Sequence, residues 1–415
     1  DFIMEKQDFI MEKQDFIITS LQPWDIEIGS TIKNTALEIS KENRVLYVST
    51  PLDVASILRS LLHKDTSAPF HRRMEVLRGK TPPLRQINEN MWVLDCPFTL
   101  LSISKFPTSL FNFFNRKNNK KLGRWISQQA QTIGFCNYIH LIDTDIFRSR
   151  YLKKYLQPAL SIYYRRDYIV GEGYWRKHGP RSEYELAASA DIVLANSTNF
   201  AEELKVYNPQ TFPIETGVNL DLYDASRIYN TPADIRNIPH PIVGYLGTVN
   251  STRLNGDLLM ALAKQRPQYS FVFTGPEDEG FRMHPIHNLS NVYFTGKKTV
   301  SELPSYLCAY DICINPQMVN PITDGNYPLK IDEYLAMGKP TVATSTHTMR
   351  DIFATYTHLA SNEKEWLTAI DIALSEAGNR TLEQERIAFA HTHSWGHSVQ
   401  KIYRIINNYL KEKDR

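Results

Sequence analysis

The segment Asn320–Thr344 reads NPITDGNYPLKIDEYLAMGKPTVAT and predicts a short helix with a defined start and end. Pro328 suits the first helical position, because the amide hydrogen that proline lacks would have no partner there. Gly338 suits the left-handed residue that closes a helix, and Pro340 prevents further helical turns. The segment therefore encodes a single short helix between two irregular stretches.

Lys330 and Glu333 lie three residues apart, so they share one face of this helix. A lysine beside the positive end of a helix suits a pyrophosphate group. A carboxylate one turn later can accept two hydrogen bonds from the diol of a ribose. A surface lysine–glutamate pair without any ligand fits the same spacing, and these residues alone leave both interpretations open.

The segment Ile242–Leu259, IVGYLGTVNSTRLNGDLL, has the composition of a phosphate-binding loop. A strand ends at Gly247, small polar residues follow, and Arg253 precedes a helix that starts near Asn255. Glycine and small side chains let backbone amides approach a phosphate, and arginine can hold it through two hydrogen bonds. Glycine loops are common in proteins, so this segment alone does not establish a phosphate-binding loop, and other motifs are needed to support that interpretation.

Short β-branched runs alternate with stretches of helical spacing, which predicts βαβ units around mostly parallel sheets. The expected strands of a first series are Phe16–Thr19, Arg44–Ser49, Met91–Leu94, Tyr138–Ile142, Leu160–Tyr164 and Asp191–Ala195. Those of a second series are Ile242–Gly247, Ser270–Gly275, Asn291–Thr295, Asp311–Asn315 and Thr341–Thr344. We expect an α/β protein of two Rossmann-like domains that face a cleft, with ligands beyond the carboxyl ends of the strands.

Pattern and composition also predict the domain boundaries. We expect one domain over residues 14–220, a second over 221–395, and a C-terminal helix over 396–415 that can cross back to the first domain. The heptapeptide DFIMEKQ occurs at residues 1–7 and again at 8–14, so we expect the duplicated segment 1–13 to lie outside the fold. Helical spacing further marks residues 30–41, 148–155, 182–190, 200–207, 381–390 and 398–410.

The composition is that of a globular protein with little net charge. The 415 residues are 42% hydrophobic and carry a formal charge of +2, which argues against a nucleic-acid-binding protein. The four cysteines lack the spacing of a zinc site, and reduced thiols are expected. No apolar run reaches the roughly 18 residues of a membrane span, and no secretory signal is evident, so we expect a cytoplasmic protein.

Five segments of the second half resemble the carboxyl-terminal domain of GT-B glycosyltransferases of the family 4 type, the glycosyl transferases group 1. They occur in the family's order as ETGVNLDLYD (215–224), GYLGTV and RLNGDLL (244–259), FVFTGP (271–276), NVYFTGKKTVSELPSYL (291–307) and PLKIDEYLAMGKPTVAT (328–344). The first half resembles the acceptor domain of that family more loosely, through residues 23–51 and 182–197.

The resemblance implies a nucleotide-diphosphate sugar as donor, no further cofactor and no metal. Arg253 and Lys330 would hold the diphosphate, and Glu333 would bind the ribose hydroxyls. The remaining donor-binding residues implied by the resemblance and the loop pattern are Gly247, at the end of its strand, and Gly296 and Lys297 beside the base.

One position departs from the family pattern. The family commonly has a second glutamate eight residues before the one at Glu333, in contact with the donor sugar. Here that position is Gly325, and Asp324 beside it is the candidate substitute. The identity of the sugar and the retention of its anomeric configuration are therefore less firmly implied.

Two residues of the first half are candidates for the donor or acceptor side. Gly29 lies at an expected strand-to-helix turn, where the backbone can approach the donor phosphates, although Ser30 as an ordinary helix cap explains the turn equally. Asp167 follows an expected strand and can orient or deprotonate an acceptor hydroxyl. The alternative for Asp167 is an ion pair with the neighbouring Arg165 and Arg166.

Two further motifs are interpreted as structural. Asp143-Thr144-Asp145 has the DxD pattern of a metal site, but it precedes a helix-like segment, and helix capping explains it. Gly171-Glu172-Gly173 lacks the rest of a dinucleotide-binding fingerprint and is interpreted as a loop.

A basic segment follows residue 105. Residues 96–142 contain no acidic residue, and the segment 106–124 combines phenylalanines with Arg116, Lys117, Lys120, Lys121 and Arg124. Aromatic residues beside a basic run favour peripheral contact with an anionic membrane at its cytoplasmic face. A buried helix followed by a solvated basic loop is the alternative.

We therefore expect a glycosyltransferase that moves a sugar from a nucleotide-diphosphate sugar to a hydroxyl of a glycan or lipid-linked acceptor. The resemblance further implies retention of configuration and a place in cell-envelope or exopolysaccharide assembly. A sugar-nucleotide epimerase of related fold and an inactive nucleotide-sugar-binding subunit are the alternatives, and Gly325 in place of glutamate keeps the latter open.

Overall fold

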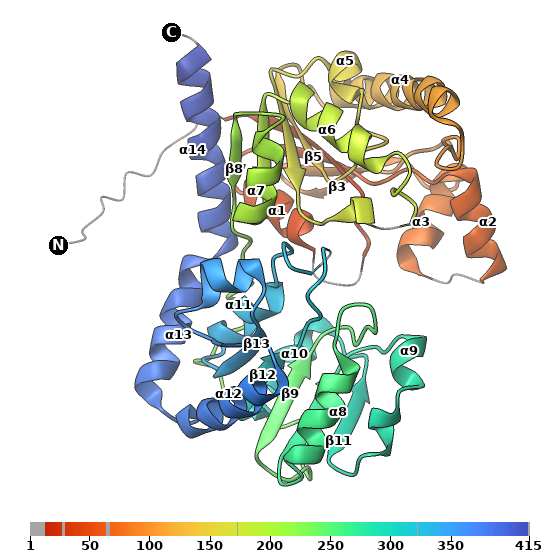
Figure 1. The fold of residues 1–415 in the computed structure, drawn as a ribbon. Helices are drawn as coiled ribbons and strands as arrows, with labels where there is room; N and C mark the ends of the chain where they lie inside the picture. The colour runs from red at the N-terminus through yellow and green to blue at the C-terminus, as the bar shows by residue number, and fades with distance from the viewer. Residues whose placement is uncertain (1–12, 27–29, 64–66, 172, 322, 414–415) are drawn as a thin grey trace. The chain divides into compact units, whose positions relative to one another are not determined.

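The computed structural model describes residues 13–26, 30–63, 67–171, 173–321 and 323–413. The chain forms two compact units, each an α/β domain (Figure 1). Unit 1 comprises the chain up to Ile214 together with the residues from Ser398 onward, and unit 2 comprises Glu215–His397. The duplicated segment lies almost entirely outside the described residues, and the first strand begins at Asp15.

The sheet of unit 1 has the strand order β3-β4-β2-β1-β5-β6-β7-β8. All neighbouring strands are parallel except β3 and β4. The strands are β1 (Asp15–Ser20), β2 (Arg44–Val48), β3 (Leu84–Asn88), β4 (Met91–Leu94), β5 (Tyr138–Asp143), β6 (Leu160–Arg165), β7 (Ile192–Ala195) and β8 (Thr211–Pro213). The carboxyl ends of the parallel strands therefore lie at one edge, as a doubly wound sheet requires.

Helices cover both faces of this sheet. Phe16 and Ile18 of β1 belong to one buried cluster and Ile17 to another, because successive side chains of a strand point to opposite faces. Helices α1 and α14 contribute to the first cluster, and α4 and α5 to the second. The helices of unit 1 are α1 (Thr31–Ile39), α2 (Val54–Leu62), α3 (Ala68–Leu77), α4 (Thr108–Thr132), α5 (Leu152–Leu156), a 3-10 turn η1 (Ile169–Gly171), α6 (Gly179–Ser189), α7 (Thr198–Lys205) and α14 (Trp395–Lys413).

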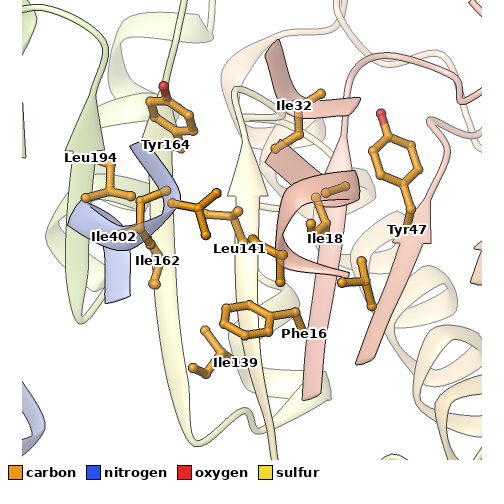
Figure 2. Packing of buried hydrophobic residues seen from close by; sticks show 14 of the residues in the cluster. Phe16, Ile18, Ile32, Tyr47, Ile139, Leu141, Ile162, Tyr164, Leu194 and Ile402 are labelled. Carbon is orange, nitrogen blue, oxygen red and sulfur yellow. The ribbon is translucent and has the colours of Figure 1, made fainter. Parts of the chain in front are cut away.

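The C-terminal helix α14 packs on the N-terminal sheet. Figure 2 shows Ile402 of α14 beside Ile162 of β6 and Leu194 of β7, in the cluster that also holds Phe16. The amide of Asn43 donates a hydrogen bond of 2.7 Å to the hydroxyl of Tyr403. The expectation of a C-terminal helix that crosses back is thus met by both apolar packing and a buried hydrogen bond.

The sheet of unit 2 has the order β11-β10-β9-β12-β13-β14, and all its neighbouring strands are parallel. The strands are β9 (Ile242–Leu246), β10 (Ser270–Thr274), β11 (Val292–Gly296), β12 (Ile312–Asn315), β13 (Thr341–Thr344) and β14 (His358–Ala360). Counted within the unit, this is the Rossmann order 3-2-1-4-5-6. The strand order reverses between β9 and β12, which is where such sheets bind ligands.

The helices of unit 2 again form two layers. One buried cluster combines residues of α10, α11 and α13 with the sheet, and another combines α8 and α12 with its opposite face. These elements are α8 (Gly256–Gln265), α9 (Glu279–Arg282), α10 (Leu303–Ala309), α11 (Leu329–Ala336), α12 (Glu363–Glu376), α13 (Arg380–Thr392), the 3-10 turns η2 (Pro285–Asn288) and η3 (Val300–Glu302), and the π-helical turn η4 (Met349–Phe353).

The α/β fold with two mostly parallel sheets confirms the predicted fold class. Each expected strand is present within one residue of the expected bounds at either end. The three strands that the pattern missed, β3, β8 and β14, all lie at sheet edges. Edge strands are short and partly polar, so they carry little alternation. None of the described helices combines the length and apolarity that a membrane span requires.

Two helix expectations need correction. The segment 148–155 is helical only in α5, because the carboxylate of Asp145 accepts the amide of Arg148 and holds the preceding residues in a turn. The basic residues of 106–124 do not follow a helix as a loop. They lie on α4 itself, which runs unbroken from Thr108 to Thr132.

Candidate functional site

The loops after β9 and β12 pair with each other at the point where the strand order reverses. The amide of Met318 donates to the carbonyl of Arg253 at 2.8 Å, and the amide of Asn255 donates to the carbonyl of Pro316 at 3.0 Å. These bonds fix the backbone of the expected phosphate-binding loop. The side chain of Arg253 is exposed beyond them and makes no hydrogen bond or ion pair with the rest of the described chain.

Two glycines let the loops after β9 and β10 approach each other. Gly247 has φ 139° and Gly275 has φ 151°, values that favour glycine. A Cβ on Gly275 would lie 2.0 Å from the carbonyl oxygen of Gly247. The amide of Gly247 donates to the carbonyl of Thr274 at 2.9 Å. Any side chain on Gly275 would therefore push the two loops apart.

Lys330 lies beside Gly247. Its Nζ donates a hydrogen bond of 2.7 Å to the hydroxyl of Tyr245 and lies 4.4 Å from the centre of that ring. A Cβ on Gly247 would be 3.0 Å from the same nitrogen. The structure thus brings together the loop and the helix that the sequence predicted separately. The tyrosine hydroxyl donates onward to the carbonyl of Thr248 at 3.0 Å, so it holds the amine at the loop.

Helix α11 carries Lys330 and begins one residue later than predicted. Pro328 precedes the helix with ψ 82°, which is not helical, so it serves as the N-cap residue instead of the first helical residue. Gly338 has φ 70° and closes the helix as expected. Helix boundaries shift by a residue or two between criteria, and the order of lysine and glutamate on the helix is unaffected.

A buried polar network anchors α11 from behind. Asp332 is fully buried and accepts hydrogen bonds from the hydroxyl of Tyr327 at 2.6 Å and from Nδ1 of His393 at 2.8 Å. Burial raises the pKa of Asp332, while its two hydrogen-bond partners oppose that shift. Because a buried carboxylate without partners is costly, this network fixes the rotation of the helix.

Glu333 is half-buried next to Lys330. Burial raises the pKa of its carboxyl to about 7, and both the Lys330 ammonium and a hydrogen bond from Tyr223 oppose the rise. Tyr223 is buried and comes from the segment that enters unit 2. The carboxyl group therefore changes charge near neutral pH, and any ligand that binds the carboxylate should bind more tightly as the pH rises.

Gly296 and Lys297 lie at the carboxyl end of the same sheet. Gly296 ends β11 with φ 73°, and Lys297 follows it with an exposed side chain. The hydroxyl of Thr295 donates to that of Thr274 at 2.8 Å and ties the ends of β11 and β10 together. Both predicted residues thus stand on the edge that carries Gly247.

Asp324 lies in the loop between β12 and α11. Its carboxylate accepts the backbone amide of His347 at 2.8 Å, and the hydroxyl of Thr348 donates to the carbonyl of Gly325 at 3.2 Å. These bonds connect the loop to the residues after β13. One oxygen of Asp324 thus has a structural partner, and the catalytic role stays a prediction.

The predicted residues of unit 1 have local partners. Asp167 forms an ion pair of 3.7 Å with Arg166, and its side chain is 43% exposed, so it remains accessible. Arg165 does not share this pair, because it is buried against Glu183 and Glu203. Gly29 lies outside the described residues, while Ser30 accepts the amide of Lys33 as the cap of α1.

The DxD motif is built into the protein interior. Asp143 forms a bidentate ion pair with Arg166 and accepts the hydroxyl of Ser20 at 2.6 Å. Thr144 has φ 56°, which is unusual for a β-branched residue. Asp145 is buried and accepts the amide of Arg148. Gly171, the first residue of the second discounted motif, ends the turn η1.

Comparisons with known proteins identify the family that unit 2 resembles and the fold of the chain. Residues 240–376 match the family model described as Glycosyl transferases group 1. Residues 240–376 form a group 1 domain, and the chain has the GT-B fold. The recognition made from sequence motifs is thereby confirmed.

One curated relative of this chain is 25% identical over 241 residues. It is TuaH of Bacillus subtilis, named as a glycosyltransferase of teichuronic acid biosynthesis. The alignment covers 55% of the chain studied and 60% of TuaH.

Solved structures of GT-B proteins agree in fold. HepE of Anabaena in complex with UDP has a TM-score of 0.63 at 14% identity, covering 95% of the chain and all of HepE. Sucrose-phosphate synthase of Thermosynechococcus elongatus has a TM-score of 0.65 at 17% identity, covering 96% of the chain and all of the synthase. At these identities the likeness concerns the fold.

Sequence reasoning missed two residues that position the candidate site of unit 2. Tyr245 holds Lys330, and Tyr223 binds Glu333, although neither tyrosine is close to its partner in sequence. The motif segments ETGVNLDLYD and GYLGTV contain both tyrosines. The sequence did offer one signal for these positions: each is a tyrosine, with a polar hydroxyl, near the end of a buried strand or in the segment that enters unit 2.

Replacing Tyr223 with phenylalanine tests this arrangement directly. The variant loses the hydrogen bond that stabilises the Glu333 carboxylate, so the pKa of Glu333 should rise above about 7. Carbon-13 NMR of labelled glutamate side chains measures the titration. Tyr229→Phe is the control, since that hydroxyl donates to the carbonyls of Leu222 and Asp224. An unchanged titration in Tyr223→Phe would show that the hydroxyl does not act on Glu333.

Proposed function

We propose that the protein transfers a sugar from a nucleotide-diphosphate sugar to a hydroxyl acceptor, with retention, in the assembly of a cell-envelope or extracellular polysaccharide. One observation carries the proposal. The Lys330 amine lies against the Gly247 loop where the strand order reverses, and Glu333 is three residues further on the same helix. A cation for a diphosphate and a carboxylate for a ribose diol thus occur together.

The donor would bind across the carboxyl edge of unit 2. Lys330 and Arg253 would neutralise the diphosphate, and the amides of the Gly247 loop would approach it. The ionised carboxylate of Glu333 would accept both ribose hydroxyls. Gly296 and Lys297 would lie beside the base, at the end of a strand two positions away from β9.

The relatives support the class of donor and of pathway. Three structures of HepE are named as complexes with UDP, with UDP and glucose, and with UDP-glucose. TuaH is named as a glycosyltransferase of teichuronic acid biosynthesis. UDP and UDP-glucose are therefore the first probes for this chain.

The reaction would break the bond between the anomeric carbon and the diphosphate oxygen. The acceptor oxygen forms the new bond on the same face of the sugar, and the leaving phosphate takes the acceptor proton. Positive groups stabilise the charge that develops on the leaving diphosphate, so Lys330 and Arg253 would do the work that a divalent metal does in other enzymes. Asp324 would contact the donor sugar, and Asp167 would orient the acceptor hydroxyl.

The acceptor would be a glycan or a lipid-linked sugar on the cytoplasmic side of the cell. We propose a protein that works in the cytoplasm and contacts an anionic membrane peripherally through residues 106–124. The exposed lysines and arginines of α4 support this contact.

Alanine variants of Arg253 and Lys330 test the diphosphate clamp. Each should weaken UDP binding by about 1.5–3 kcal/mol, because each removes a charge-assisted hydrogen bond. Titration calorimetry measures the loss. Lys264→Ala is the matched control, since Lys264 is exposed on α8, outside the loops that form the proposed site. Affinities equal to that of the parent in both clamp variants would remove these residues from the donor site.

Incubation of the purified protein with UDP-glucose, with and without EDTA, tests the reaction. Slow release of free glucose that persists with EDTA is expected of a metal-independent transferase that uses water in place of its acceptor. Chromatography of the products separates the alternatives. An isomerised donor would identify an epimerase, and tight binding without turnover would identify an inactive binding subunit. Activity lost with EDTA and restored by manganese would contradict metal independence.

A further inference from the structure

Helix α2 presents its apolar side to solvent. Val54, Leu58, Leu61 and Leu62 are 48%, 57%, 54% and 82% exposed. Their spacing places them on one side of the helix, and we call them the α2 stripe. No residue of α2 is buried.

The half-buried residues of α2 are Ser56, Ile57 and Ser60, and the start of the helix is held by polar contacts. The hydroxyl of Ser56 donates to the carboxylate of Asp53 at 2.7 Å, and the amide of Ala55 donates to the hydroxyl of Ser102 at 2.9 Å. A surface helix normally packs its apolar side on the core and turns polar residues outward. In α2 the four residues of the stripe are exposed, and Ile57 is the one large apolar side chain that is half-buried. Contiguous exposed apolar side chains mark a surface that binds something.

The start of α2 is joined to the middle of α4 by a short segment. The amide of Leu100 donates to the carbonyl of Leu52 at 3.1 Å. The next residue, Leu101, is 48% exposed and exchanges two hydrogen bonds with the side chain of Asn118, at 3.0 and 3.1 Å. The α2 stripe and α4 therefore flank one segment of unit 1.

The outward side of α4 is apolar at its start and basic along its length. Its exposed residues at helical spacing are Leu110, Phe113, Lys117, Lys120, Lys121 and Arg124. The ammonium of Lys117 lies 4.5 Å from the ring centre of Phe113. Phe111 is buried, so only part of the aromatic run faces outward. We call Lys117, Lys120, Lys121 and Arg124 the basic face.

The charge of this region sets it apart from the rest of the chain. Residues 54–142 contain 13 lysines and arginines and 4 aspartates and glutamates, whereas the whole chain has a formal charge of +2. The remainder of the protein is thus acidic overall. An extended anionic surface would therefore be attracted more strongly to this region than to the rest of the chain.

We propose that the α2 stripe and the basic face together form a surface that binds an anionic lipid bilayer. The stripe enters the boundary between headgroups and acyl chains, and the basic face binds the headgroups. Aliphatic side chains beside lysines and arginines suit this interface, because it is apolar and anionic within a few ångströms. The role of this surface rests on the proposed function, since the protein would reach a lipid-linked acceptor from the surface of the bilayer.

Sedimentation of the full chain with lipid vesicles tests the proposal. The parent should bind vesicles that contain phosphatidylglycerol, and high salt should weaken that binding. The variant Leu58→Ser/Leu61→Ser should bind them at least about tenfold more weakly, because two leucines no longer leave water. Its affinity for UDP should equal that of the parent. The control Val206→Ser/Ile228→Ser removes two exposed aliphatic side chains, 84% and 98% exposed, outside the surface and should bind as the parent does.

Three outcomes would overturn the proposal. The stripe variant could sediment with vesicles as the parent does, or the parent could bind neutral phosphatidylcholine vesicles equally well. Light scattering could instead show a parent dimer that the stripe variant converts to a monomer, so that a second copy covers the stripe. Failure of the parent to release glucose from UDP-glucose would count against the proposed transfer and leave the lipid surface untouched.

Discussion

The amine of Lys330 lies between the hydroxyl of Tyr245 and the backbone of Gly247, and the proposed site of unit 2 depends on this contact. The glycine directly follows β9, the first strand of the unit, and the lysine belongs to the helix that follows β12, the fourth strand. Gly247 has no side chain, so the amine can approach the loop to within 3.0 Å of an ideal Cβ position. A side chain at Gly247 would displace the lysine amine, the one cation of α11, from the loop proposed to bind the diphosphate.

Two adjacent carboxyl groups on α11 differ in their surroundings. Asp332 faces the interior and is fixed by Tyr327 and His393. Glu333 is held by Tyr223 and balanced by Lys330, and burial raises its pKa to about 7. Since this folded pKa exceeds the value of about 4.3 for an unfolded chain, the carboxyl contributes less to stability as the pH rises through that interval. The ionised form of Glu333 therefore lowers the free energy of unfolding, which a residue with a purely structural role has no reason to do.

Much of the fold could be predicted from the sequence, because buried parallel strands carry continuous apolar runs. The edge strands β3, β8 and β14 could not, since they are short and mix polar with apolar residues. Lys330, Glu333 and Gly247 could be predicted as site residues, because each lies in a short sequence motif that can be recognised without knowledge of distant contacts. Tyr223 could not be found so easily, as its contact with Glu333 joins residues far apart in the chain. The exposure of the α2 stripe could not be predicted either, because amphipathic spacing does not say which side of a helix faces the core.

The most direct test of this account compares the affinities of UDP and 2′,3′-dideoxy-UDP by calorimetry between about pH 6 and pH 8, across the pKa of Glu333. The diphosphate titrates alike in both ligands, so the difference between them isolates the ribose hydroxyls. The account predicts that UDP binds more tightly and that its advantage grows as Glu333 ionises. Glu333→Gln, which keeps only one acceptor oxygen, should lose most of that advantage. Equal affinities for the two ligands at every pH would contradict the assignment of Glu333 to the ribose and, with it, of this edge of unit 2 to the donor.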